Sequence, residues 1–563
     1  MNKIELNSPA GDMDCVKAAI YNGADSIYLG SKFFNARRLA NNFSMDDIKS
    51  IIKMAHLHGV KIYLTMNTLV RNNELKAWFK HLEQAYLLGI DAIILQELHL
   101  IPLIRKYFPG LRIHASTQSS LMNYRAINSF DIDLAVLARE LTLDEIKLIR
   151  QHTKKELEVF VHGHLCVSYS GQCLISSLIG KRSGNRGVCA SSCRKEYNRE
   201  GYLISPKDLM LANHIKDLSK IGVNAIKIEG RMKDANYVAT TTKTYRHQID
   251  TVNNPKNLTN DQIDELKLGF NRDFTTGFLT GNKSIIDYTM PMNRGVYLGK
   301  IKHDRLKLEA DLEKGDGVGF WHPSFGGKLQ GFVLSSLYIN NEKSESAKKG
   351  DYISIPSRHF FENVLVYQTS KRDKSFFIGD PKLIINDITI SGSLDQKLIV
   401  TIGDKIVESE IPLQQSKNRS ISKIMFIEEF NKSKNKGLIF NITNFYVEKN
   451  LFMPLSTLTK LRKEMENVVL SNNVPKRISN LENLPEIKPN KPKCDPKLIV
   501  KVYDIKQLKE AIQTKIDYIY FDIFNDDVNY AKELCKDIKF FLDTPVVMTD
   551  KDISRAQNII NDI

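Results

Sequence analysis

The chain has 563 residues, 42% of them hydrophobic, so it is long enough for several domains and apolar enough to bury sizeable cores. Its 80 Lys and Arg residues outnumber 65 Asp and Glu residues, and the formal net charge of +15 favours a polyanionic partner. No apolar run approaches the roughly 20 residues of a bilayer-spanning helix, and the first residues lack the pattern of a secretory signal. We therefore expect a cytoplasmic protein without membrane spans.

Short apolar runs alternate with amphipathic stretches through the first 250 residues. The apolar runs cover residues 4–7, 26–30, 61–66, 91–95, 111–115, 133–138, 157–162 and 224–229. The helical patterns between them cover residues 12–22, 44–58, 74–88, 97–107, 118–129, 142–152 and 206–221. Eight strands with intervening helices predict a TIM-like (β/α)8 barrel over 1–253. A doubly wound open sheet is the alternative, but no glycine-rich phosphate turn follows the first run.

The residues that follow these runs are unusually polar. They include Arg37, Asn67, His114, Gln118, Arg139, His162, Glu229 and Arg231. Each alone is equally explained as a helix cap or a solvated ion pair. However, all eight strand ends meet at one rim of a barrel, where such folds carry their chemistry. Together they predict a mouth that binds an anionic, oxygen-rich ligand.

Four of the seven cysteines fall within 28 residues, in the segment 164–205 between the seventh run and its helix. They are Cys166, Cys173, Cys189 and Cys193. Four thiolates can saturate one zinc ion or hold an iron–sulfur cluster. The glycines and basic residues between them argue against a packed core, and a reducing cytosol argues against disulfides. A long insertion at the reactive end of a barrel favours a catalytic cluster over a structural zinc.

The rest of the chain divides into four further segments. A connection of helix and loop is expected over 254–293, and short strands with Gly-Asp turns over 294–480 predict one or two small β-barrels and a helix near 455–470. A proline-rich linker spans 481–495. Residues 496–563 repeat the opening strand–helix–strand pattern, which predicts a partial second barrel.

A basic and aromatic mixture stands out near the end of the β-rich segment. It comprises Lys417, Arg419, Lys423, Lys432, Lys434 and Lys436 with Phe426, Phe430, Phe440, Phe445 and Tyr446. Such a mixture can grip phosphates and stack bases. More often it is a solvated edge with a buried aromatic face, and both interpretations stay open.

Several motifs of the first barrel resemble the collagenase-like peptidase family U32. They lie at residues 158–166, 171–176, 185–187, 205–209 and 227–233. His164 departs from the pattern, since the family usually carries a small residue there. Residues 294–470 are also similar to the central domain of the longer RNA-hydroxylase members, of the type that forms 5-hydroxycytidine in 23S ribosomal RNA.

The resemblance implies an iron–sulfur enzyme, with a [4Fe-4S] cluster on Cys166, Cys173, Cys189 and Cys193, that hydroxylates an RNA base, cytidine in 23S rRNA, with a prephenate-like dicarboxylate as donor. On this hypothesis the ligand-binding residues are Arg37, Asn67, Gln118, Arg139 and Arg231. The residues expected to move protons are His114, His162 and Glu229. Two alternatives remain: a U32-type peptidase, and a non-catalytic RNA-binding or ribosome-assembly protein with a structural zinc.

Overall fold

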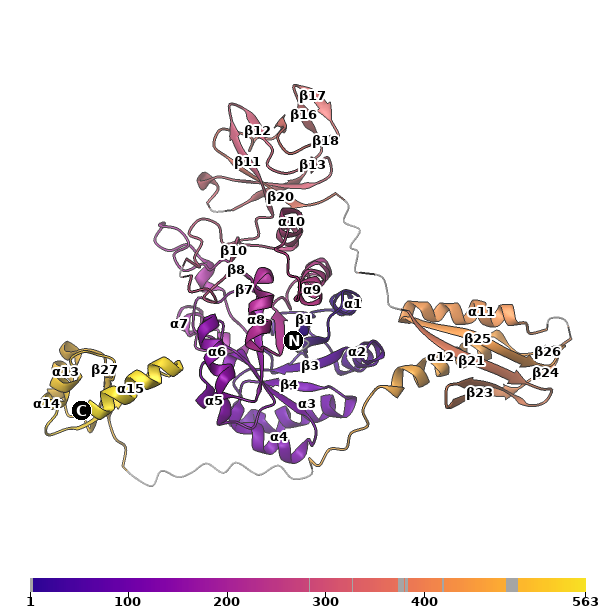
Figure 1. Ribbon diagram of the computed structural model, residues 1–563, viewed down its shortest axis with the longest axis horizontal. Coiled ribbons are helices and arrows are strands. Elements are labelled where there is room, and N and C mark those ends of the chain that lie inside the picture. Colours follow the sequence, from indigo (N-terminus) through magenta and orange to yellow (C-terminus); the bar gives the residue numbers. More distant parts are fainter. Residues whose placement is uncertain are drawn as a thin grey trace.

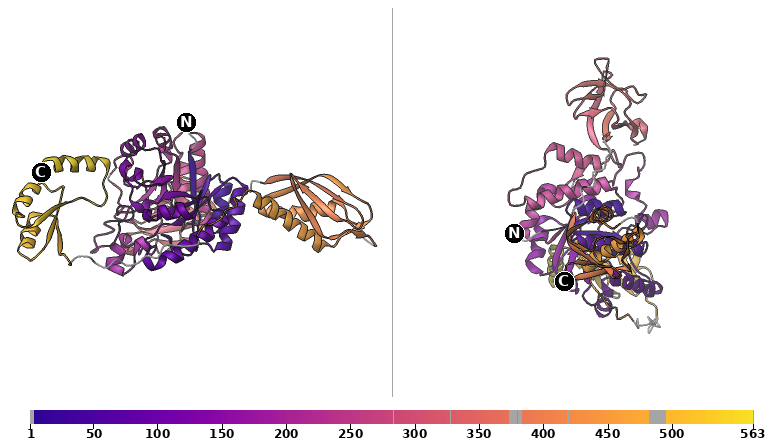
Figure 2. Two further views of the ribbon diagram at one scale, coloured as in Figure 1. Left: turned by 90° about the horizontal axis from the view of Figure 1, so that it is seen from below. Right: turned by 90° about the vertical axis from the view of Figure 1, so that its right-hand side faces the viewer.

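The computed structural model describes residues 4–282, 284–326, 328–372, 379, 383–417, 420–481 and 495–562. A barrel forms the centre, and three smaller bodies extend from it in different directions (Figure 1, Figure 2). Within this described part, no helix is both long enough and apolar enough to cross a membrane.

Eight parallel strands close into the predicted barrel. The strands are β1 (Glu5–Pro9), β2 (Ser26–Gly30), β3 (Lys61–Met66), β4 (Ala92–Leu95), β5 (Arg112–Ala115), β6 (Leu134–Val136), β7 (Glu156–His164) and β9 (Ala225–Ile228). The barrel closes because β9 pairs with both β1 and β7. The helices around it are α1 (Met13–Tyr21), α2 (Met45–Leu57), α3 (Leu75–Leu88), α4 (Ile101–Tyr107), α5 (Tyr124–Asn128), α6 (Leu143–His152), α8 (Ile215–Ile221) and α9 (Ala235–Asp250).

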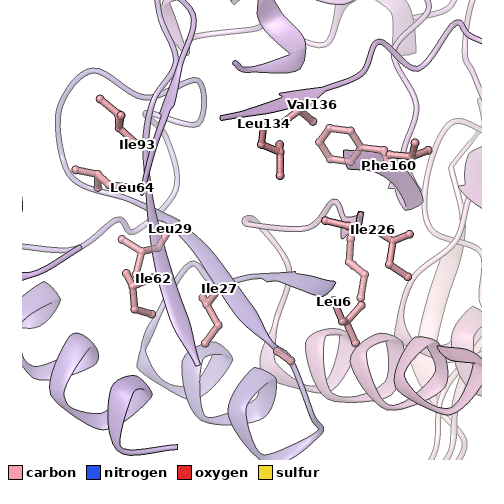
Figure 3. Packing of buried hydrophobic residues seen from close by; sticks show 14 of the residues in the cluster. Leu6, Ile27, Leu29, Ile62, Leu64, Ile93, Leu134, Val136, Phe160 and Ile226 are labelled. Carbon is pink, nitrogen blue, oxygen red and sulfur yellow. The ribbon is translucent and has the colours of Figure 1, made fainter. Parts of the chain in front are cut away.

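Apolar strand residues build the barrel core. Side chains such as Leu6, Ile27, Ile62 and Ile226 are fully buried (Figure 3). Strands covered by helices on one face and packed inside the barrel on the other are buried on both sides, which explains their nearly continuous apolar runs. Local signals fix the helices as well; Ser44, for example, caps α2 in a reciprocal capping box.

Strand β7 continues past the barrel rim. There its end pairs antiparallel with β8 (Asp208–Met210), which in turn pairs with β10 (Phe274–Thr275). The helix expected over 206–221 is therefore wrong in its first part, because 208–210 form a strand and the α-helix begins only at Ile215. The insertion 164–205 thus leaves and re-enters the barrel through two paired strands. It carries the short helix α7 (Ile175–Gly180).

The central region contains two modules with separate cores. Residues 296–370 form an eight-stranded antiparallel sheet around one core. Residues 384–472 form a four-stranded sheet packed against two helices. Its elements are β21 (Ile384–Gly392), β22 (Lys397–Ile402), β23 (Lys405–Pro412), β25 (Leu438–Val447), α11 (Lys423–Asn431) and α12 (Leu455–Asn472). A second β-barrel, which the sequence left open, is therefore not what this region forms.

The aromatic residues of that second module pack mainly inward. Phe426, Phe430 and Phe440 are buried in its core. Their burial favours the interpretation of a solvated edge over a base-stacking surface. Arg419 lies outside the described residues.

The last body is a β/α unit that resembles the start of a barrel. Its parallel strands are β27 (Ile499–Val502), β28 (Tyr518–Asp522) and β29 (Lys539–Asp543), and its helices are α13 (Ile505–Ile512), α14 (Val528–Leu534) and α15 (Asp550–Asp562). It touches the first barrel where Asp550 accepts a hydrogen bond from Nη1 of Arg125 at 2.8 Å. Most of the proline-rich linker, 482–494, lies outside the described residues.

Candidate active site at the barrel mouth

A pocket opens at the carboxyl ends of the strands, beneath the insertion 164–205. It is lined by Arg37, Asn67, Gln118, Arg139, Glu229 and Arg231, by Lys227 and His164, and by Cys166, Cys173, Cys189 and Cys193. Ten of the twelve residues named from the sequence therefore meet at one place. They come from five different strand ends and the insertion, and strand ends meet in this way at a barrel mouth.

His114 and His162 do not reach this pocket. His114 is fully buried beside the Tyr63 ring, 4.6 Å between centroids, and neither of its ring nitrogens has a hydrogen-bond partner in the described part. The ring of His162 packs against Tyr245. Burial lowers the pKa of His162 to about 3 and lowers that of His114 strongly, so both rings are neutral. The expectation that they line the mouth is wrong, because their side chains enter the core instead.

Arg37 and Glu229 form an ion pair in the pocket wall. Nη2 of Arg37 donates to Oε1 of Glu229 at 2.9 Å. Burial alone raises the pKa of Glu229, but the charges of Arg37 and Arg139 outweigh this effect and hold the pKa below its ordinary value. Glu229 is therefore an ionised carboxylate at neutral pH.

Arg231 is held by neutral groups. It donates to Thr65 Oγ1 at 3.0 Å and to Asn35 Oδ1 at 2.9 Å. Burial lowers its pKa to about 10, so the guanidinium stays charged at neutral pH without a carboxylate partner in the described part. Of three arginines expected to clamp a ligand, this one and Arg37 are thus already engaged by the protein.

Arg139 is the arginine left available. Its guanidinium carbon lies 4.4 Å from the centroid of the Phe160 ring. Its Nε atom is buried without a partner, and no carboxylate of the described residues forms an ion pair with it. A buried cationic donor without a partner is costly, so an anionic ligand at this position stabilises it.

The floor of the pocket holds a lysine that the sequence analysis did not assign. Nζ of Lys227 lies 2.9 Å from Oε2 of Glu158, whose other oxygen accepts a 2.6 Å hydrogen bond from Asn7. The same Nζ sits 4.3 Å from the centroid of the Tyr28 ring. Burial lowers the pKa of Lys227, and Glu158 works against that effect. The sequence did contain a signal for this pair, since Glu158 and Lys227 are charged residues within otherwise apolar runs.

The four cysteines of the insertion all line the pocket, and none forms a disulfide. Burial raises the pKa of Cys166, and it raises that of Cys193 to about 11; Arg139 opposes the shift at Cys166. Among the residues that the structure describes, no three His, Cys, Asp or Glu side chains are arranged to hold a single metal ion. The donor set itself suits iron–sulfur chemistry, since such clusters are held by several cysteine thiolates.

Close backbone contacts hold the insertion over the mouth. A Cβ added at Gly171, where φ is +79°, would lie 2.0 Å from the carbonyl oxygen of Gln118. On the other side, the backbone N–H of Arg38 donates to Gly187 at 3.2 Å. Glycine is therefore required at Gly171 for both conformation and space.

His164 lies at the edge of the cysteine group. Its Nδ1 atom is 3.4 Å from guanidinium nitrogens of Arg194 and Arg272. Since a guanidinium only donates, Nδ1 must accept. Arg272 also donates to Asp208 at 3.1 Å, which ties the segment after the barrel to the base of the insertion.

Comparison with known proteins agrees with this architecture. The family model for peptidase family U32 matches residues 11–288. An uncharacterized protease of Methanocaldococcus jannaschii is 36% identical over 401 residues, which cover 64% of this chain and 96% of that protein. The chain therefore belongs to peptidase family U32.

Several relatives are named for RNA hydroxylation. The tRNA hydroxylation protein P1 of Bacillus subtilis is 34% identical over 50% of this chain and 71% of its own length. The 23S rRNA 5-hydroxycytidine C2501 synthase of Escherichia coli is 38% identical over 45% of this chain and 40% of its own length. The family thus includes proteins named as protease and proteins named for RNA hydroxylation.

Proposed function

We propose that the protein is an iron–sulfur-dependent hydroxylase of an RNA base, with cytidine in 23S ribosomal RNA as the substrate and a prephenate-like dicarboxylate as the oxygen donor. The observation that carries the proposal is the meeting of four thiols with an unpaired arginine, Arg139, in one pocket. The names of the relatives at 34% and 38% identity support RNA as the substrate.

The residues of the pocket have distinct roles in this proposal. Cys166, Cys173, Cys189 and Cys193 hold the cluster, which supplies the redox chemistry when bound. Arg139 binds a carboxylate of the donor with its planar fork. Glu229 accepts a proton at Oε2, since Oε1 is held by Arg37. A base reaches such a pocket only from a single strand or after it has been flipped out.

A peptidase is the second candidate, because one relative is named a protease and another, from Porphyromonas gingivalis, is named a collagenase. Nucleophilic catalysis needs a thiol or hydroxyl beside an oriented base. In the described part, no cysteine of the pocket is hydrogen-bonded to a histidine, and Nδ1 of the neighbouring His164 is occupied by arginines. The geometry favours the hydroxylase.

Two experiments test the proposal together. Protein purified without oxygen is expected to contain iron and sulfide, with loss of both in Cys173→Ala but not in the matched variant Cys15→Ala, which lies outside the pocket. Ribosomal and transfer RNA from a deletion strain is expected to contain a nucleoside lighter by one oxygen, as read by mass spectrometry. Zinc in place of iron and sulfide would support a structural metal, and unchanged RNA with collagen cleavage by the pure protein would support the peptidase.

A further inference from the structure

Three loops surround the pocket and contain no carboxylate. They are residues 31–42, 67–73 and 166–195, which we call the collar; they carry three, one and five Lys and Arg residues, respectively, and no Asp or Glu. The chain as a whole has 65 acidic residues against 80 basic ones, so a stretch this one-sided is not explained by composition. These three loops therefore border the pocket with an excess of positive charge.

The collar is one continuous surface. The N–H of Leu69 donates to the carbonyl of Asn185 at 3.4 Å, and the Arg186 guanidinium donates to the carbonyl of Leu69 at 2.8 Å. Ala36 donates from its backbone to Asn67 at 3.1 Å. The three loops thus touch one another beside the pocket.

Most of the collar's charge is free to meet a partner. Arg37 pairs with Glu229, and Arg186 pairs with Glu74, which follows the collar. The exposed cations without an ion pair among the described residues are Lys32, Arg38, Arg71, Lys181, Arg182 and Lys195. In the described part, these six cations therefore have no direct carboxylate partner.

Large apolar side chains stand beside these cations. Leu178 is 81% exposed and Ile179 is 65% exposed on α7, and Phe33 is 59% exposed on the loop 31–42. Exposed apolar groups next to uncompensated cations match a partner that combines phosphates with flat apolar faces. An acidic protein would match the charge, but it would not require these side chains.

We propose that the collar is the docking surface for a single-stranded or locally unstacked RNA segment, with Lys32, Arg38 and Lys181 contacting phosphates and with Leu178 and Ile179 contacting bases at the pocket entrance. This inference rests on the proposed function for its choice of RNA. It places RNA on the first barrel and not on the basic and aromatic segment 417–446, whose Phe426, Phe430 and Phe440 are buried. Inserted apolar side chains are a known means of separating bases.

The charge part is tested with the full-length protein and a fluorescently labelled single-stranded RNA, by anisotropy over a range of salt. The collar variant Lys32→Ser/Arg38→Ser/Lys181→Ser is expected to bind at least about tenfold more weakly, with a salt slope shallower by about two, since each lost phosphate contact removes roughly 0.7. The matched control is Lys423→Ser/Lys434→Ser/Lys449→Ser in the second central module. Equal behaviour of the two triple variants, or loss in the control alone, would overturn the proposal.

The apolar part is tested with Leu178→Ser/Ile179→Ser, whose exposed positions make a folding defect unexpected. This variant is expected to lose affinity for RNA but not for inorganic polyphosphate, whereas the collar charge variant loses affinity for both. Equal losses for both polymers in the apolar variant, or competition by poly-glutamate as effective as competition by RNA, would overturn the RNA assignment.

Binding and modification are read separately. If the collar variant binds RNA weakly while cellular RNA shows no protein-dependent oxidation, the docking surface stands and the hydroxylase proposal fails. If the oxidised nucleoside depends on the protein but forms equally well with the collar variant, the hydroxylase proposal stands and the docking surface fails.

Discussion

Nζ of Lys227 lies 2.9 Å from Oε2 of Glu158, and both side chains are almost fully buried at the floor of the pocket. The pair sits inside the closed barrel, where neither charge is solvated. Replacing only one residue of the pair therefore affects stability differently from replacing both residues.

Lys227→Met is expected to destabilise the protein by about 3–5 kcal/mol, because it leaves Glu158 buried and unpaired. The double variant Lys227→Met/Glu158→Gln is expected to recover most of that loss. Thermal or urea unfolding of the two variants measures the difference. A double variant as unstable as the single one would show that the lysine acts through packing alone.

Glu229→Gln is expected to lower the free energy of unfolding by about 1.5–3 kcal/mol at neutral pH, the worth of a hydrogen bond to a charged group. The folded pKa of Glu229 lies below its ordinary value, so the stabilisation is present above that ordinary value and is lost as the pH falls through the folded pKa. The difference between wild type and variant is therefore expected to shrink in acid. Unfolding measured from neutral pH down to about pH 2 covers the range below the ordinary carboxyl pKa and checks this sign.

Arg139→Ala is expected to weaken binding of a dicarboxylate such as prephenate by about 10- to 100-fold. The reason is that Arg139, whose Nε has no partner in the described part, would form charge-assisted hydrogen bonds with the ligand, and these are lost. Calorimetric titration of the purified protein gives the affinity. The exposed Arg305→Ala in the first central module serves as the control. An unchanged affinity in Arg139→Ala would move the anion site elsewhere.

Gly171→Ala is expected to displace the cysteine-bearing insertion, since the new Cβ would meet the carbonyl of Gln118 at 2.0 Å and the backbone has φ of +79°. Reduced iron content and faster proteolysis within 164–205 are the expected readings. Gly180→Ala is the matched control in the same insertion, because nothing lies within 4 Å of its added Cβ. Similar behaviour of both variants would argue against a fixed insertion.

The barrel could be predicted because apolar strand patterns alternate regularly with amphipathic helix patterns along the sequence. The apolar runs 26–30 and 61–66 coincide with β2 and β3, and the capping residue Ser44 marks the start of α2. The polar strand ends also met at one mouth, since parallel strands bring their ends to one rim. The fold class and the location of the pocket can thus be predicted from the spacing of the apolar runs.

The roles of the individual pocket residues could not be predicted from the sequence, because the sequence does not show which side chains will form hydrogen bonds or ion pairs with one another. Nothing local showed that Arg37 would be paired with Glu229, 192 positions away, or that Arg231 would bind Asn35. The side chain of His114 points into the core although the residue lies next to the end of β5. Lys227 went unassigned because its partner, Glu158, stands on a different strand of the barrel.

The pairing of β7 with β8 has a consequence for turnover. The cysteine-bearing segment begins at the end of β7 and leads into β8, and these two strands are hydrogen-bonded to each other. Moving the segment away from the mouth would therefore break interstrand hydrogen bonds. If the protein is the proposed hydroxylase, we therefore expect the insertion to stay in place during the reaction, so that RNA enters and leaves through the pocket mouth without movement of the insertion.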